Sequence, residues 1–316
     1  MQDLDALIPR LAKREIRAIA RAISLAETPG RARLELLHRL FPYSGGAFKI
    51  GITGAPGAGK STLTTHLLSK LQAAGRKPAA LAVDPTSPFS GGAILGDRIR
   101  MQAATELEGV YVRSMASRGS LGGLSRGVAG AIRVLEAAGF DAIVIETVGS
   151  GQLQVDVRYV ADVVALTLVP EAGDVIQAMK AGIIEIADIY VINKADREGA
   201  QRMKTDLRSA LELGGRSMEW IPPIVLTNGL TGDGLDDLFG FIQERQEALS
   251  NDGLTERRKE QLEWELRALA VEAMESQAKT ALKELFEPSA IEQVLTKQRD
   301  PFVELMQLWD GRKPSV

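Results

Sequence analysis

The stretch GAPGAGKS, residues 54–61, decides the fold because it fits the pattern G-x-x-x-x-G-K-[ST]. It follows the short apolar run FKIGIT (48–53) and precedes a helical pattern. A glycine-rich turn between a strand and a helix presents backbone N–H groups to a phosphate, and the helix dipole favours negative charge there. We therefore expect a phosphate-binding loop, rather than a turn that only packs a strand on a helix, formed by Gly54, Ala55, Pro56, Gly57, Ala58, Gly59, Lys60, Ser61 and Thr62.

A second motif, NKAD at residues 193–196, ends the apolar run DIYVIN (188–193) and points to guanine as the bound base. The carboxylate of Asp196 can accept both N1–H and N2–H of guanine. Adenine offers no donor at either place and would leave the carboxylate unpaired. We expect Asn193 to brace the loop and the stem of Lys194 to lie along the ring. Together the two motifs predict a site for GTP or GDP.

Oxygen-bearing side chains at the predicted strand ends indicate a Mg²⁺ site beside the phosphates. We expect Ser61 to bind the metal through its hydroxyl and Lys60 to reach the β- and γ-phosphates. Asp84, Asp97 and Glu146 supply carboxylates, which hold Mg²⁺ directly or through a water. Asp84 or Asp97 alone would be more typical of a helix cap or a turn. Three carboxylates at the appropriate strand ends favour the metal.

Seven short apolar runs, most of them separated by helical stretches, predict an α/β fold with a mostly parallel sheet. Continuous apolar strands joined by helices are typical of sheets that helices cover on both faces. In such sheets ligands bind where the carboxyl ends of the strands meet the following loops. The runs are FKIGIT (48–53), PAALAV (78–83), VYVRS (110–114), DAIVIE (141–146), DVVALTLV (162–169), DIYVIN (188–193) and PIVLT (223–227).

The apolar pattern divides the chain into three parts. Residues 1–43 show helical spacing and form a predicted N-terminal extension, and residues 44–250 contain the alternating strands and helices of the nucleotide-binding domain. Residues 251–316 are again helical and highly charged, and form a predicted C-terminal arm.

Within the arm, the apolar residues from Leu262 onward recur at steps of three and four. This rhythm fits either an intramolecular packing seam or a dimer seam. We expect Pro288 and Pro301 to end helices, because proline disrupts a helix interior. The three tryptophans of the chain are interpreted as packing residues: Trp220, Trp264 and Trp309.

Composition excludes several classes of protein. The 316 residues are 45% hydrophobic and 25% charged, which is typical of a globular chain. The formal net charge is −3, so no overall attraction to nucleic acid is expected. The chain contains no cysteine and two histidines, which exclude thiol catalysis and a multi-histidine metal site. No apolar run reaches the roughly 20 residues of a membrane span and no secretory leader is visible, so we expect a cytoplasmic protein without a membrane partner.

Six stretches in this order resemble the MeaB/ArgK family of P-loop GTPases in the SIMIBI class: GITGAPGAGKSTL, AVDPTSPFSGGAILGDRIRM, SRGSLGG, ETVGSGQ, AGDVIQAMKAGIIEIAD and NKAD. The resemblance extends over nearly the whole chain and is less specific in the helical ends. It implies a GTPase chaperone that gates cofactor loading and protects or reactivates an adenosylcobalamin-dependent acyl-CoA mutase. It also implies a homodimer formed through the C-terminal helices.

The resemblance assigns further residues. Arg100 would belong to one switch, and a second switch, which couples the nucleotide state to the mutase, would contain Asp174, Gln177 and Lys180. Without the resemblance, Gln177 and Lys180 would be interpreted as part of a solvated helix face. Asn228 and Gly229 stand in the fifth guanine loop, where the family usually has Ser and Ala. The implied catalytic residues are Lys60, Asp97, Arg100, Glu146 and Lys180.

The sequence around Gly149 predicts slow hydrolysis. Glu146-x-x-Gly149 stands where a GTPase usually has Asp-x-x-Gly, so the Gly149 N–H is expected to sense the γ-phosphate. Ser150 occupies the next position, where other GTPases often carry the glutamine that positions water. Gln152 or Asp97 could approach in three dimensions. We therefore expect the partner to order the switches and complete the site.

Three alternatives stay open at this stage. A nickel or cobalt metallochaperone GTPase shares the fold class but needs clusters of Cys or His, which this chain lacks. A P-loop small-molecule kinase would bind ATP, which the NKAD motif disfavours. A binding module with a vestigial nucleotide site would bind its partner without regard to nucleotide, yet the positions expected to contact phosphate and metal carry suitable residues.

Overall fold

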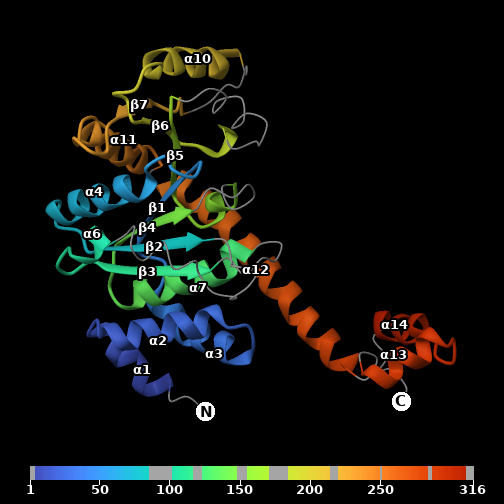
Figure 1. Cartoon of the computed structure of the whole chain (residues 1–316). Coiled ribbons are helices and arrows are strands. Elements are labelled where there is room, and N and C mark those ends of the chain that lie inside the picture. The colour runs from blue at the N-terminus through green and yellow to red at the C-terminus, as the bar shows by residue number, and fades with distance from the viewer. Residues whose placement is uncertain are drawn as a thin grey trace.

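A computed structural model of the chain describes eight segments of it. They are residues 4–84, 102–116, 123–147, 155–170, 184–213, 220–249, 251–283 and 287–310. Every helix, strand and contact below lies within these segments (Figure 1).

Seven strands form one sheet in the order β3-β2-β4-β1-β5-β6-β7. Every neighbouring pair is parallel, as the sequence predicts for strands that alternate with helices. The phosphate-loop strand β1 lies at the centre, between β4 and β5. The strands are β1 (Phe48–Gly54), β2 (Pro78–Asp84), β3 (Tyr111–Ala116), β4 (Ala142–Thr147), β5 (Val163–Leu168), β6 (Ile189–Asn193) and β7 (Ile224–Thr227).

Helices bury both faces of the sheet, because successive residues of each apolar strand point to opposite sides. On one face, Ile50 and Ile52 of β1 share a core with α4 (Lys60–Ala73) and α11 (Leu235–Ala248). On the other face, Ile143 and Ile145 of β4 share a core with α7 (Gly123–Ala137) and α10 (Ala200–Leu213). The prediction of an α/β sheet covered on both sides is confirmed. The short helices α6 (Gln102–Thr105), η2 (Val157–Tyr159) and η3 (Ile184–Ile186) complete the layers.

The N-terminal helices form an additional layer outside α7 (Figure 1). Arg14, with a φ of 55°, separates α1 from α2, and its guanidinium donates to the carbonyl of Ala138 just after α7. Ala22, Ile23 and Ala26 of α2 are buried against this side of the core. The helices are α1 (Leu4–Ala12), α2 (Ile16–Glu27), α3 (Arg31–Leu40) and η1 (Phe41–Tyr43).

Charged contacts of residues from Arg257 to Glu272 attach the long helix α12 (Asn251–Ala281) to the body. Two buried carboxylates at the amino ends of β5 and β6 bind consecutive arginines of α12. Asp162 Oδ2 lies 3.0 Å from Arg258 Nη2, and Asp188 Oδ2 lies 2.9 Å from Arg257 Nη1. Further along the helix, Glu265 pairs with Arg133 of α7 at 2.6 Å and Glu272 pairs with the buried Arg33 of α3 at 2.5 Å. Removing one partner of a buried ion pair leaves a buried charge without compensation and destabilises the fold. These pairs therefore keep α12 in a defined position on the body.

The C-terminal end of α12 extends away from the body, and α13 (Pro288–Leu295) and α14 (Pro301–Trp309) lie at its far end (Figure 1). The prediction that Pro288 and Pro301 end helices is wrong, because each is the first residue of a helix. Proline fits this position, since its fixed φ suits a helix and its missing N–H would have no partner there.

The interpretation of Trp309 as a packing residue is also wrong within one chain, because Trp309 is 92% exposed.

No helix among the described residues is long and apolar enough to cross a membrane.

Candidate functional site

The phosphate loop connects β1 to α4 at the carboxyl edge of the sheet. Gly54, Gly57 and Gly59 have φ values of 140°, 75° and 89°, a region that side-chain-bearing residues rarely adopt. A Cβ at Gly54 would overlap the carbonyl of Thr167 on β5, and a Cβ at Gly59 would overlap the side-chain amide of Asn193. The glycines therefore permit both the turn and the close approach of the neighbouring strands.

Lys60 begins α4 and its side chain is buried across the loop. Its Nζ donates to the carbonyl oxygens of Gly54 at 2.9 Å and Ala55 at 2.8 Å. The ammonium group thus lies within the curve of the loop, at the amino end of a 14-residue helix. Both the ammonium and the helix dipole supply positive potential where a phosphate would lie.

Glu146 on β4 contacts α4 through both carboxylate oxygens. The Ser61 hydroxyl donates to Oε1 at 2.6 Å and the Thr64 hydroxyl donates to Oε2 at 2.9 Å. The pairing of β4 with β1 places Glu146 beside Ile52, next to the end of the phosphate-loop strand. The sequence assigned Ser61 and Glu146 to the same predicted metal site but did not identify Thr64. Thr64 lies three residues after Ser61 on the same face of the helix, and this spacing could have indicated the contact.

The side chain of Asn193 connects three loops at the end of β6. Its Nδ2 donates to the Ala58 carbonyl of the phosphate loop at 2.8 Å. Its Oδ1 accepts from Thr227 Oγ1 and from the Gly229 N–H, both at 3.1 Å. These hydrogen bonds join the end of β6 to the phosphate loop and to the loop after β7. Thr227 was not identified from the sequence as a partner.

The NKAD loop and the loop after β7 lie side by side. The Ala195 N–H donates to the Thr227 carbonyl at 3.0 Å, and Lys194 adopts a φ of 57° in the intervening turn. Asp196, three residues after Asn193, is exposed.

The loop after β7 is held from α4 as well. His66 Nε2 lies 2.9 Å from the Gly229 carbonyl, and a Cβ on Gly229 would lie 3.2 Å from the methyl group of Thr62. Asn228 Oδ1 accepts the N–H groups of Leu230 and Thr231, so this side chain shapes its own loop. The contact of His66 with Gly229 was not predicted from the sequence, because an isolated histidine on a helix gives no local signal for its partner.

The remaining predicted metal and switch residues are Asp84 and six residues outside the described segments. Asp84 is the last residue of β2, next to β4 at the same edge of the sheet. Among the described residues, no group of three or more His, Asp or Glu side chains could hold a metal. Six predicted residues lie outside the described residues: Asp97, Arg100, Gly149, Asp174, Gln177 and Lys180.

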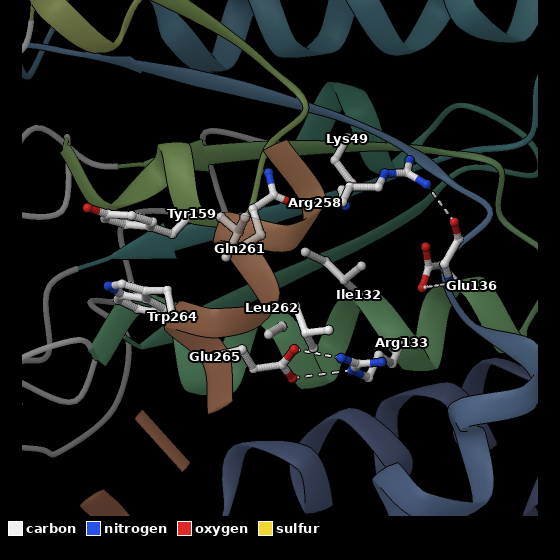
Figure 2. Close-up of a pocket in the computed structure, with 13 residues that line it drawn as sticks. Lys49, Ile132, Arg133, Glu136, Tyr159, Arg258, Gln261, Leu262, Trp264 and Glu265 are labelled. Atoms are coloured by element: carbon white, nitrogen blue, oxygen red, sulfur yellow. Dashed lines mark hydrogen bonds and ion pairs between the residues drawn. The ribbon is translucent and has the colours of Figure 1, made fainter. Parts of the chain in front are cut away.

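A cavity of about 190 Å³ lies far from the phosphate loop, between α7 and α12 (Figure 2). The charged side chains that line it are paired with carboxylates, other polar side chains or backbone groups. Arg133 forms two contacts with Glu265, and Glu136 accepts the N–H groups of Gly45 and Ala47. Tyr159 and Trp264 stack at 4.9 Å over one end of the cavity. We interpret it as part of the junction that attaches the arm.

A phosphate loop on a central strand, an NKAD loop two strands away and a seven-stranded parallel sheet define a P-loop GTPase. The family model of the methylmalonyl-CoA mutase-associated GTPase MeaB matches residues 19–283, and the chain belongs to this family.

Similar proteins agree with this assignment. A protein of Pyrococcus horikoshii named as a GTPase is 45% identical over 306 residues, which cover 96% of each chain. The mouse mitochondrial homologue of methylmalonic aciduria type A protein is 35% identical over 79% of this chain and 65% of its own length. The crystal structure of a LAO/AO transport system kinase has a TM-score of 0.70 at 26% identity, covering 97% of this chain and 96% of that one.

Two glycine substitutions test whether Asn193 and the phosphate loop require close contact. Gly57 and Gly59 both have positive φ, but only the added Cβ of Gly59→Ala meets Asn193, whereas that of Gly57→Ala meets nothing within 4 Å. We expect Gly57→Ala to cost about 1–2 kcal/mol of unfolding free energy from backbone strain. Gly59→Ala should cost about 1–3 kcal/mol more, because hydrogen bonds to Asn193 are also lost. Urea unfolding measures both, and equal losses would contradict the contact.

Proposed function

We propose that this GTPase is a chaperone for an adenosylcobalamin-dependent acyl-CoA mutase. In this role it gates cofactor loading and protects or reactivates the mutase. The observation that carries the proposal is the match of residues 19–283 to a family described as methylmalonyl-CoA mutase-associated. The mouse relative, whose name refers to methylmalonic aciduria, supports a mutase of the methylmalonyl-CoA type as the partner.

The arrangement of α4 and β4 supports a metal-dependent nucleotide site. Mg²⁺ prefers oxygen ligands, and Ser61 Oγ lies 2.6 Å from Glu146 Oε1 at the amino end of α4. Ser61 would bind the ion, with Glu146 and the carboxylates of Asp84 and Asp97 around it. When bound, Mg²⁺ would neutralise charge on the phosphate oxygens. Lys60 would turn from the loop carbonyls toward the β- and γ-phosphates.

The two loops held by Asn193 would recognise the base. Asp196 would accept N1–H and N2–H of guanine, and Lys194 would cover the ring. The exposed position of Asp196 and the fixed Gly229 loop support this orientation. An adenine nucleotide would leave the carboxylate without a donor, which disfavours the kinase alternative.

Hydrolysis would be slow until the mutase binds. Ser150 replaces a water-positioning glutamine, so the attacking water would lack an orienting side chain at that position. The mutase would order the switch segments that include Arg100, Asp174, Gln177 and Lys180. Arg100 and Lys180 would then stabilise charge on the transferring phosphoryl group, and the Gly149 N–H would contact the γ-phosphate. Phosphoryl transfer depends mainly on positioning and charge stabilisation, so a partner can complete the site.

The direct test is GTP turnover by the purified protein, alone and with equimolar methylmalonyl-, isobutyryl- or 2-hydroxyisobutyryl-CoA mutase. We expect slow turnover alone and at least about a ten-fold rise with the client mutase. ATP should not be hydrolysed. Lys180→Ala should bind GDP normally and lose most of the rise.

The outcomes separate the alternatives. GTP turnover that no mutase accelerates would remove the mutase from the proposal and leave a GTPase with another client. Turnover of ATP in place of GTP would favour a small-molecule kinase. Full stimulation of Lys180→Ala would remove that residue from the catalytic group.

The arm would form a homodimer. The proposed organisation is a helical extension at 1–43, a nucleotide domain at 44–250 and a dimerising arm at 251–316. Leu262 and Leu266 are 45% and 55% exposed, so the apolar face of α12 is incompletely covered within one chain. At the far end of the arm, Phe302 and Trp309 are 69% and 92% exposed. Apolar side chains gathered on one projecting element are typical of a protein interface.

Light scattering coupled to gel filtration tests the dimer. Wild-type protein should have twice the 34.0 kDa mass of the chain. The double variant Phe302→Ser/Trp309→Ser should shift toward the monomer, because apolar burial at the interface is lost. Ile221→Ser is the matched control, since Ile221 is 82% exposed and lies outside the arm. A monomeric wild-type protein, or an unchanged double variant, would contradict an arm-mediated dimer.

A further inference from the structure

Thr64 occupies a buried position between α4 and the candidate metal site. Its side chain is fully buried, and its hydroxyl donates to Glu146 Oε2 at 2.9 Å. The Ser61 hydroxyl, one turn earlier on the same face of α4, donates to the other oxygen. One short helical segment therefore binds both oxygens of a buried carboxylate.

The two hydroxyls have different surroundings. Ser61 is partly exposed at the start of α4, where the phosphate loop ends, whereas Thr64 lies deeper, against the centre of the sheet. Glu146 itself is buried, and its strand neighbours are Ile52 of β1 and Ala82 of β2. A donor at the deeper oxygen offsets part of the cost of burying the carboxylate.

Because the glutamate side chain is long, the hydrogen bond from Thr64 also restricts the orientation of its carboxylate. Glutamate has one more rotatable bond than the aspartate common at this position in GTPases, so its carboxylate has more orientations available. A hydrogen bond to Oε2 restricts rotation of the carboxylate, and Oε1 is then directed at Ser61. Partners of this kind behind metal-binding groups commonly determine metal affinity.

We propose that Thr64 is a positioning residue for Mg²⁺: its hydroxyl fixes the carboxylate of Glu146 so that Oε1 faces Ser61 and the nucleotide. The proposal rests on the proposed function, because it assumes that Ser61 and Glu146 serve the metal of a guanine nucleotide. It assigns Thr64 no contact with substrate or metal.

Thr64→Val removes the hydroxyl and keeps the volume and shape of the side chain. Oε2 of Glu146 then loses this donor, and its carboxylate can turn away from Ser61. Thr64→Ser keeps the hydroxyl. Thr65→Val is the matched control, because it makes the same chemical change at the next residue of α4, where the hydroxyl donates back to the Ser61 carbonyl within the helix.

The measurement is the release rate of a fluorescent GDP analogue as a function of Mg²⁺ concentration, with thermal unfolding without Mg²⁺ and nucleotide as the check on folding. We expect Thr64→Val to raise the Mg²⁺ concentration that gives half-maximal slowing of release by about 10-fold to 100-fold. Thr64→Ser should restore most of the wild-type value, and Thr65→Val should match the wild-type protein. If Thr64→Val does not fold, Thr64→Ala decides the test with the same expectation.

Three results would overturn the proposal. One is an unchanged Mg²⁺ requirement in folded Thr64→Val. Another is a shift of equal size in Thr65→Val, which would indicate a general weakening of α4. The third is a Thr64→Ser variant that behaves like Thr64→Val. The failure of the proposed metal-dependent nucleotide site is distinguishable, because GDP release from the wild-type protein would then not respond to Mg²⁺ at all.

Discussion

The candidate site depends on the buried side-chain amide of Asn193. One end of this amide binds the Ala58 carbonyl of the phosphate loop, and the other accepts hydrogen bonds from Thr227 and Gly229 beside the base loop. These bonds lie away from water, where an unsatisfied polar group is costly. Asn193 thereby fixes the phosphate loop relative to the loop after β7. Gly59 is necessary for this arrangement, since a Cβ there would occupy the place of the amide.

The helix α4 and the strand β6 connect the loops around Asn193 to other parts of the molecule. The first turns of α4 contact Glu146 through Ser61 and Thr64, and His66 reaches Gly229 from the same helix. At the amino end of β6, Asp188 binds Arg257 of the arm helix α12 and Arg245 of α11. The five residues of β6 therefore connect the attachment of the arm to the NKAD loop. The arm and the candidate nucleotide site are therefore attached to opposite ends of the same strand.

The sequence predicted those features that depend on local pattern. Continuous apolar runs identified all seven strands, and the glycine spacing of residues 54–61 identified the phosphate loop. Proline was ambiguous at 288 and 301, because it is compatible with both the end and the first residue of a helix. Thr64 could not be assigned without knowing how deeply Glu146 lies beneath α4. The charged attachment of α12 was also beyond prediction, since Arg33 and Glu272 are 239 residues apart and leave no local signal.

The central claim is that Asn193 aligns the phosphate loop with the base loop. Calorimetric titration of GDP into Asn193→Ala and wild-type protein, at saturating Mg²⁺, tests it most directly. Both proteins should unfold cooperatively on heating, and the variant should bind GDP at least about ten-fold more weakly, because the hydrogen bonds between the loops are lost. An Asn193→Ala variant that folds and binds GDP with wild-type affinity would contradict the claim.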